Sequence, residues 1–433
     1  MKFVFKVIIL FLIVFNFRLP FVYNSAFVSI ILCWLYYLRN RRKVPFTFFF
    51  QRYIVVILIV SLIIIFVVIS IALMHGTDAF DPQRRYWIVF QMLGAVIFAL
   101  PLLVEGKESS AIEEISIIIC CAFALQGVSC VAAYLYPPLA DIFMKIKPED
   151  LAMDLRTSDI ENRFRYLSLS GVMLMELAAI FGVAFIVFFW MQLKNNHPFM
   201  RGWRKYILFF LIFLGTVFAG RTGFFGLLFG FVGWLYFSFN RIFKVLEQNL
   251  AYIVSCTALI LFIFYFVFNS NQRNAFTDEV FPFAFEWYYN YIDYGKVEVA
   301  SMEVIPSHYY YLTDETLLHG HGISAYDTNS PYPHSDAGYI NRLIYGGIPF
   351  LVFLIICQCM YFARPLAIAI KNRSRESKID RVFFLLLFIY VFVVEIKSPA
   401  ICYLHSLLVM YLALGSSYIY SYYLQRQQDR LNK

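Results

Sequence analysis

The chain alternates between long apolar runs and short polar or charged connections along most of its 433 residues. The apolar runs are about 16–25 residues long, which is the length at which an α-helix crosses the hydrocarbon core of a bilayer. This pattern predicts an all-α polytopic integral membrane protein. The twelve transmembrane spans that we expect lie near residues 3–17, 21–38, 53–75, 86–104, 112–136, 170–193, 206–219, 222–239, 250–268, 339–363, 382–397 and 399–424.

The composition excludes the soluble globular class, because 61% of the residues are hydrophobic and only 15% are charged. The first run, after Met1-Lys2, lacks a small-residue cleavage site, so we expect it to be retained rather than removed as a signal peptide. All eight cysteines fall within apolar runs, which argues against a disulfide scaffold and against a thiolate metal site.

The net charge of +8 does not indicate a nucleic-acid partner, because the basic residues gather in connections between apolar runs. If these connections face the cytoplasm, as the positive-inside tendency requires, both termini are cytoplasmic. The basic connections are 39–43, 194–205, 240–244 and 371–381. The opposite face then receives residues 137–169 and 269–338. We therefore divide the chain into spans one to nine (1–268), one large external loop (269–338), and spans ten to twelve with the tail (339–433).

The loop over 269–338 is too long for a plain connector and too aromatic for disorder. It contains ten acidic and two basic residues. We expect a structured cap on the outer side of the membrane. Trp287 and Tyr288 are candidate sugar-stacking residues; the alternative is an interfacial helix whose aromatic rings sit at the level of the lipid headgroups.

The same loop carries the stretch HGHG, with His319 and His321, followed by His334. Three histidines invite a zinc hypothesis, but no cysteine joins them and no helical His-Glu-x-x-His pattern exists. We therefore expect a tight glycine turn and no metal.

His334 stands directly before the tenth span, and Arg342 follows eight residues later. Ser335 or Asp336 is a candidate N-cap of the helix that begins near Tyr339. A helix N-terminus that faces outwards favours anions. Arg342 would lie about 12 Å further along the helix axis. It then lines the same cavity as His334 or extends to the lipid headgroups.

Arg221 lies in the stretch GRTG between two apolar runs. One helix over 206–239 would be about 51 Å long, whereas the hydrocarbon core is about 30 Å thick, so the chain must turn at Arg221. An arginine at a tight turn near the membrane is costly unless it is paired or solvated, and it becomes useful if an anion binds there.

Three further basic residues, Arg163, Arg165 and Lys397, are expected at the same outer level. Glu176 lies within the sixth span. Several cations from distant parts of the sequence, with a histidine and an aromatic cap, are typical of a site for a lipid-anchored diphosphate substrate.

The GRTG turn, the glycines Gly320 and Gly322, and HSDAGYINRLIYGGIPF (334–350) resemble signatures of the Wzy-type O-antigen polymerases. The related O-antigen ligases share the general pattern: an outer arginine, a long loop late in the chain and a histidine-led entry into a helix. Ligases commonly have His-Asn where this chain has His334-Ser335, which leaves polymerase and ligase both open, and we favour a polymerase. It implies a GT-C-like polymerase or ligase fold in the bacterial inner membrane, with a periplasmic active site.

The resemblance implies a role in lipopolysaccharide biosynthesis: inverting, metal-independent glycosyl transfer between undecaprenyl-diphosphate-linked glycans, without a cofactor. His334 would be the base or orient the acceptor, with His319 and His321 as alternative bases or sugar contacts. Arg221 and Arg342 would hold the diphosphate, supported by Arg163, Arg165 and Lys397. The expected partners are the lipid-linked donor and acceptor, membrane lipids and a chain-length regulator. A ligase that passes the glycan to lipid A-core and a flippase remain the alternatives.

Overall fold

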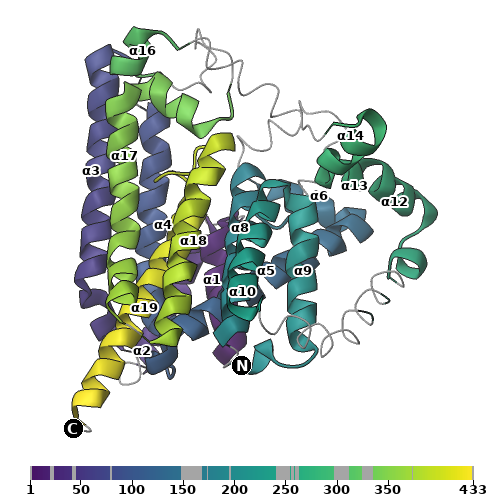
Figure 1. Cartoon of the computed structure of the whole chain (residues 1–433), viewed down its shortest axis with the longest axis horizontal. Coiled ribbons are helices and arrows are strands. Elements are labelled where there is room, and N and C mark those ends of the chain that lie inside the picture. The colour runs from purple at the N-terminus through teal and green to yellow at the C-terminus, as the bar shows by residue number, and fades with distance from the viewer. Residues whose placement is uncertain are drawn as a thin grey trace.

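Figure 1 shows the computed structural model of the chain, a bundle whose helices run up and down side by side. It describes residues 2–19, 24–40, 45–78, 80–147, 168–172, 174–194, 197–239, 254, 258, 263–296, 312–323, 335–372 and 374–431. Within these ranges the regular elements are all helices, so the predicted all-α class is confirmed for the described chain.

Six of the described helices are long and apolar enough to cross a membrane. They are α3 (Arg52–His75), α4 (Phe80–Val104), α5 (Ala111–Leu135), α8 (Leu174–Lys194), α17 (Gly338–Lys371) and α19 (His405–Leu431). The structure therefore supports a multi-pass helical membrane protein.

Five further helices occupy positions where the sequence predicts spans, but they are shorter or carry more charge. They are α1 (Lys2–Phe15), α2 (Ser25–Asn40), α9 (Arg204–Ala219), α10 (Thr222–Ser238) and α18 (Arg375–Lys397). The ninth expected span, near 250–268, lies mostly outside the described residues.

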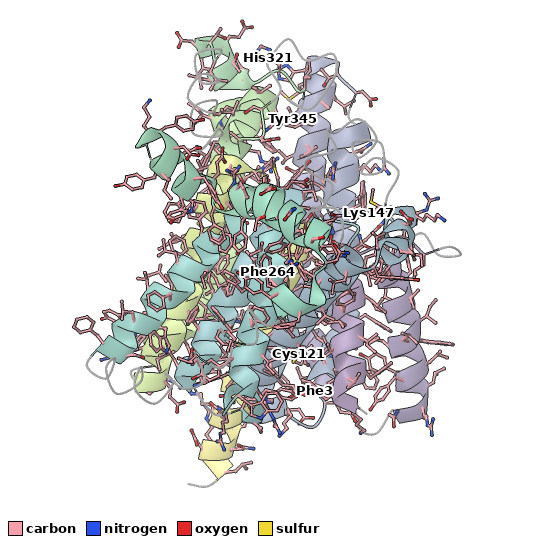
Figure 2. All side chains as sticks on the ribbon, turned by 90° about the vertical axis from the view of Figure 1, so that its right-hand side faces the viewer. Phe3, Cys121, Lys147, Phe264, His321 and Tyr345 are labelled. Atoms are coloured by element: carbon pink, nitrogen blue, oxygen red, sulfur yellow. The ribbon has the colours of Figure 1, made fainter. Side chains whose placement is uncertain are left out.

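The two chain ends lie at one end of the bundle, and α14 (Glu286–Tyr294) and α16 (Asp314–His319) lie at the other (Figure 1). Figure 2 shows the same polarity, with Phe3 towards one end and His321 towards the other. We call these the terminus end and the loop end. This arrangement agrees with the prediction that the long loop and both termini lie on opposite sides.

Helix α8 lies at the centre of the bundle and is the most buried of these six helices. It packs against α10 through glycines, because a Cβ on Gly226 would fall on the backbone of Gly182. Small residues at such a crossing let helix backbones approach closely in membrane proteins. This contact fixes the turn at Arg221 against the loop end of α8.

Helix α17 is two helices joined at a break, where Gly346 and Gly347 have non-helical backbone angles. Gly347 adopts a φ of 68°, which favours glycine. The backbone amides of His321 and Gly322 donate hydrogen bonds to the carbonyls of Ile344 and Tyr345, at 2.7 and 2.8 Å. The HGHG turn thus satisfies carbonyl groups that the break releases from the first part of α17.

The described parts of the long loop form short helices, in agreement with the expected structured cap. They are α12 (Ser270–Ala275), η7 (Phe276–Val280), α13 (Phe281–Ala284), α14 and α16, with η6 (Ile263–Val267) just before them. Four more short helices are η1 (Phe46–Phe50), η2 (Glu108–Ser110), α6 (Pro137–Lys145) and η4 (Pro198–Met200).

Candidate functional site

The loop end of the bundle contains a buried polar cluster where α4, α17 and α18 meet. Arg342 in α17 is only 6% exposed. Its Nε lies 3.5 Å from Oε1 of Glu395, and its Nη1 donates to the hydroxyl of Tyr86 at 3.1 Å. The guanidinium also lies 4.6 Å from the ring centroid of Tyr403. This enclosure rules out the alternative that Arg342 extends to the lipid headgroups.

Glu395 organises this cluster although its side chain is fully buried. Besides Arg342, its carboxylate accepts hydrogen bonds from the backbone amides of Ala400 and Ile401, the latter at 2.6 Å. A Cβ on Gly338 would lie 2.5 Å from the Cδ of Glu395, so a glycine there lets α17 approach α18. Buried charges are tolerated when they are paired and hydrogen-bonded in this way.

The connection after Glu395 differs from the prediction. The last span was expected to begin at residue 399, but α19 begins at His405, and the residues before it form a turn. The hydrogen bonds from Ala400 and Ile401 to Glu395 hold this turn, and Cys402 has a positive φ of 54°. Tyr403 and His405 are thereby placed at the loop end, at the mouth of a helix.

His405 pairs with Glu176, at the start of α8. Its Nδ1 lies 3.2 Å from Oε2 of Glu176, and Oε1 of the same carboxylate accepts the backbone N–H of Ser406 at 2.7 Å. Arg85 of α4 contributes to the electrostatic field at His405. Glu176 therefore connects the loop ends of α8 and α19.

Arg221 occupies the turn between α9 and α10 that the sequence predicts. The turn is opened by Gly220, whose φ is 136°. Arg221 forms an ion pair with Glu286 of α14 and lies 5.0 Å from the ring centroid of Phe283. The side chain of Arg221 remains 19% exposed and that of Glu286 24%. Arg221 is therefore more accessible than Arg342, and a carboxylate of the long loop contacts it.

An apolar cluster holds this part of the loop on the bundle. Its buried members come from α5, from α9, from the loop and from Phe268 just before the loop, and they are Cys130, Val217, Phe218, Phe268, Phe276, Val280 and Ala284. The hydroxyl of Tyr134 donates to the carbonyl of Gln272 at 2.7 Å. Glu286 therefore reaches Arg221 from a segment that is anchored by packing.

The predicted sugar-binding residues divide between two places. Trp287 and Tyr288 lie on α14 next to Glu286 and are 49% and 48% exposed. His321 accompanies the break of α17, and its Nε2 lies 2.9 Å from the hydroxyl of Thr316. The carbonyl of His319 contacts the His75 ring at 3.2 Å. The exposed aromatic rings thus lie on the helix whose Glu286 contacts Arg221, whereas HGHG has a structural role at α17.

The remaining predicted site residues are placed only in part. His334, Arg163 and Arg165 lie outside the described residues. Lys397 is the last residue of α18 and is half-buried. The predicted N-cap at Ser335 or Asp336 is wrong, because α17 begins at Gly338 and its N-cap is Ala337, without a side-chain hydrogen bond.

The N-terminus of α17 is stabilised from within the helix instead. The Nδ2 of Asn341 donates to the carbonyls of Ser335 and Ala337, at 2.7 and 2.9 Å. These bonds fix the backbone that leads into α17, directly after His334. The backbone between Ser335 and Asn341 is therefore hydrogen-bonded to its own helix at the loop end.

Lys147 is a buried cation that the sequence reasoning missed. It follows α6, is 3% exposed, and its Nζ donates to the carbonyls of Ser168 and Ser170 at 3.0 and 3.1 Å. Burial lowers the pKa of this lysine to about 8. Its hydrogen bonds tie the end of the 137–169 connection to the bundle.

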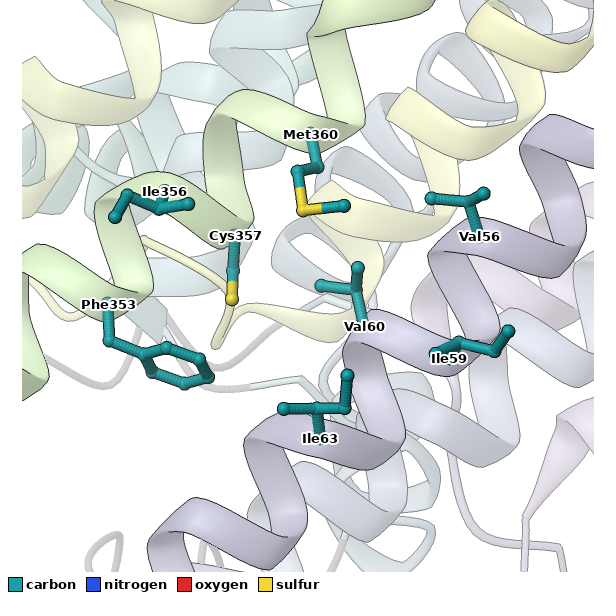
Figure 3. A pocket seen from close by; sticks show the side chains of 8 residues that line it. All are labelled: Val56, Ile59, Val60, Ile63, Phe353, Ile356, Cys357 and Met360. Atoms are coloured by element: carbon teal, nitrogen blue, oxygen red, sulfur yellow. The ribbon is translucent and has the colours of Figure 1, made fainter.

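A groove of about 310 Å³ opens between α3 and α17 (Figure 3). Its lining side chains are all apolar or sulfur-containing, and they are Val56, Ile59, Val60, Ile63, Phe353, Ile356, Cys357 and Met360. Such a surface suits a hydrocarbon chain but offers no acid, base or anion-binding group. The charged groups that a reaction needs lie instead at the loop end, in the pairs of Arg342 with Glu395 and of Arg221 with Glu286.

Metal ligands do not gather in the part of the chain that the structure describes: no group of three or more His, Cys, Asp or Glu residues is found there. The seven cysteines in these ranges are unpaired. Because His334 is outside the described residues, the expectation of no metal stays a prediction.

Comparison with known proteins does not assign the chain to a family. No protein-family model matches it, and no curated protein matches it in sequence. A functional conclusion therefore depends on the geometry at the loop end and on the motifs of the chain itself.

Proposed function

We propose that the chain is a surface-polysaccharide polymerase of the O-antigen type, which joins undecaprenyl-diphosphate-linked repeat units by inverting glycosyl transfer. The observation that carries this proposal is the Arg221–Glu286 pair. A partly exposed arginine, fixed by the glycine turn between two apolar helices, holds a carboxylate of an aromatic loop. An arginine that binds a carboxylate is equally suited to a diphosphate, because the anionic oxygens of both groups accept hydrogen bonds from the guanidinium.

In the proposed reaction a hydroxyl of the acceptor sugar attacks the anomeric carbon of the donor, and the bond from that carbon to the diphosphate oxygen breaks. Arg221 stabilises the charge that develops on the leaving diphosphate. Diphosphate is a good leaving group once its charge is held, so the step needs no metal. Trp287 and Tyr288, exposed beside Glu286, offer flat aromatic faces to the sugar rings.

Arg342 has a different part in this proposal. Its charge is already compensated by Glu395 and its guanidinium is enclosed over the Tyr403 ring, so we assign it a supporting role and no direct contact with the substrate. Direct contact with diphosphate would require the Arg342–Glu395 pair to open. His334, four positions before the first residue of α17, is assigned to the acceptor as its base or orienting group. The expected setting is twelve spans with a periplasmic site and cytoplasmic termini.

Two alternatives remain. An O-antigen ligase would use the same diphosphate chemistry with a lipid A-core acceptor. The break in α17 is the feature that speaks for a transporter or flippase, because transporters often bind substrates at discontinuous helices. Here, however, the HGHG turn fills the break and binds two of its carbonyls, which leaves these groups occupied by protein. This observation favours the glycosyltransferase.

The proposal is tested by deleting the gene and restoring it with variants, followed by gel profiling of the surface glycan. A polymerase predicts that the deletion reduces the ladder to core plus one repeat, and that wild type restores it. Arg221→Lys should restore it poorly because a point charge does not copy the guanidinium fork. Arg364→Lys is the matched control, since Arg364 binds the Tyr423 hydroxyl towards the terminus end of α17. Complete loss of capped core after deletion would instead indicate a ligase or flippase.

A further inference from the structure

A second histidine at the loop end has the geometry of an acid–base group. His405 begins α19, and its Nδ1 is held by Oε2 of Glu176 at 3.2 Å. Its Nε2 is buried and has no hydrogen-bond partner among the residues that the structure describes. The whole side chain remains 14% exposed, so the ring is enclosed but not sealed.

The carboxylate of Glu176 is itself fixed. Its second oxygen accepts the backbone N–H of Ser406 at 2.7 Å, and the hydroxyl of Ser406 donates to the carbonyl of Val14 at 2.5 Å. A carboxylate held in this way keeps the imidazole proton on Nδ1 and leaves the lone pair on Nε2. The same arrangement orients the base in catalytic triads on unrelated folds.

A capping role alone accounts for only half of this geometry. Glu176 stabilises the N-terminus of α19 through the Ser406 amide, and any residue at position 405 would permit that bond. A histidine with one nitrogen held and the other without a partner goes beyond what the cap requires. A buried nitrogen without a hydrogen-bond partner lowers the stability of the fold, and a role in the reaction explains why it is present.

The surroundings of His405 are charged on several sides. Glu176 comes from α8, and Arg85 of α4 contributes to the field at the ring. Tyr403, two residues before His405, carries Arg342 over its ring, and Arg342 is paired with Glu395 of α18. His405 therefore lies at the loop end of the bundle, the same end at which Arg221, the expected site of the anionic donor, contacts Glu286 of α14.

We propose that His405, oriented by Glu176, is the general base that removes the proton from the acceptor hydroxyl. This inference rests on the proposed glycosyl transfer. The lone pair of Nε2 takes the hydroxyl proton while the oxygen forms its bond to the anomeric carbon. The bond from that carbon to the diphosphate breaks with its electron pair, and diphosphate leaves on Arg221. The imidazolium then returns its proton to water, and His334 is left to orient the acceptor.

The test measures elongation of lipid-linked repeat units by membranes that contain the full-length chain, from pH 5.5 to 9. His405→Asn keeps a side-chain N–H for Glu176 but lacks Nε2. It should lower the rate about 100-fold or more, the usual contribution of a general base. The wild-type rate should fall on the acid side as imidazole takes up a proton, whereas the residual rate of His405→Asn should not.

Glu176→Gln tests the positioning role, and Ser406→Ala is its control in the same corner. Glu176→Gln should move the acid-side fall along the pH axis, whereas Ser406→Ala, which loses only the bond to Val14, should leave it in place. The inference is overturned if His405→Asn stays within about threefold of wild type, well short of a general base's contribution. It is also overturned if Glu176→Gln leaves the fall unmoved, which decides the matter should His405→Asn not accumulate. Absence of elongation by wild type would refute the polymerase proposal itself.

Discussion

The ion pair between Arg221 and Glu286 makes a quantitative prediction about substrate binding. If the lipid-linked diphosphate binds Arg221, it must displace the carboxylate of Glu286, which occupies the guanidinium in this structure. Glu286→Gln keeps the size of the side chain and removes its charge. The variant should therefore bind the donor more tightly, because the competing carboxylate is gone.

The exposure of the pair sets the size of the effect. Arg221 is 19% exposed and Glu286 24%, so water partly screens the interaction. A pair in this setting is worth about 1 kcal/mol, towards the upper part of the range for solvent-accessible pairs. Because 1.4 kcal/mol corresponds to a factor of ten, the apparent KM for the lipid-linked donor should fall about fivefold, with little change in kcat.

The assay follows chain elongation in membranes as a function of donor concentration. Asp293→Asn is the matched control, because Asp293 lies on the same helix, is exposed, and loses the same charge. It should leave the KM unchanged. A KM for Glu286→Gln that equals or exceeds the wild-type value would show that Glu286 does not compete with substrate, and would refute the role given to Arg221.

Three predictions concern stability in detergent, measured as the midpoint of thermal unfolding. Glu395→Gln should lower the free energy of unfolding by about 3–5 kcal/mol, because it leaves the enclosed guanidinium of Arg342 without its carboxylate. Arg342→Met combined with Glu395→Leu should recover part of this loss. An unchanged midpoint for Glu395→Gln would contradict the pairing. Gly226→Ala should lower the free energy of unfolding by about 1–3 kcal/mol, because its Cβ meets the backbone of Gly182. Gly94→Ala is the control and should be tolerated, because a Cβ there has no neighbour within 4 Å. Equal midpoints for the two variants would contradict the close crossing of α8 and α10. Burial lowers the pKa of Lys147 from 10.5 to about 8. Between pH 8 and 10.5 the folded protein has therefore released a proton that the unfolded chain still binds. The free energy of unfolding of the wild-type protein should rise across this range, by at most about 3 kcal/mol. Lys147→Met should lack that rise, and an identical pH profile would count against burial of the charge.

Much of the architecture follows from the apolar pattern and the charges beside it. The turn at Arg221 was predictable because one helix over 206–239 is too long for a bilayer, and two basic connections require the chain to cross twice. The opposite placement of the long loop and the termini followed from the same reasoning. These features depend on length and charge, which a single sequence displays directly.

The contacts within the site were not predictable in this way. Arg342 and Glu395 are 53 positions apart, and Glu176 and His405 are further apart still, so no spacing rule brings either pair together. Because the last span was expected to begin at residue 399, His405 was placed inside that helix, whereas it is the first residue of α19. The hydrogen bonds from the Ala400 and Ile401 amides to Glu395 decide where that helix begins, and tertiary contacts of this kind override local preference.

The polymerase proposal is tested most simply with the purified full-length chain in proteoliposomes, with undecaprenyl-diphosphate-linked repeat units as its only substrate. We expect a ladder of lengthened lipid-linked glycans, with one undecaprenyl diphosphate released for each repeat added, and loss of both products in Arg221→Ala. Repeat units that remain unjoined, with no undecaprenyl diphosphate released by the wild-type protein, would contradict it.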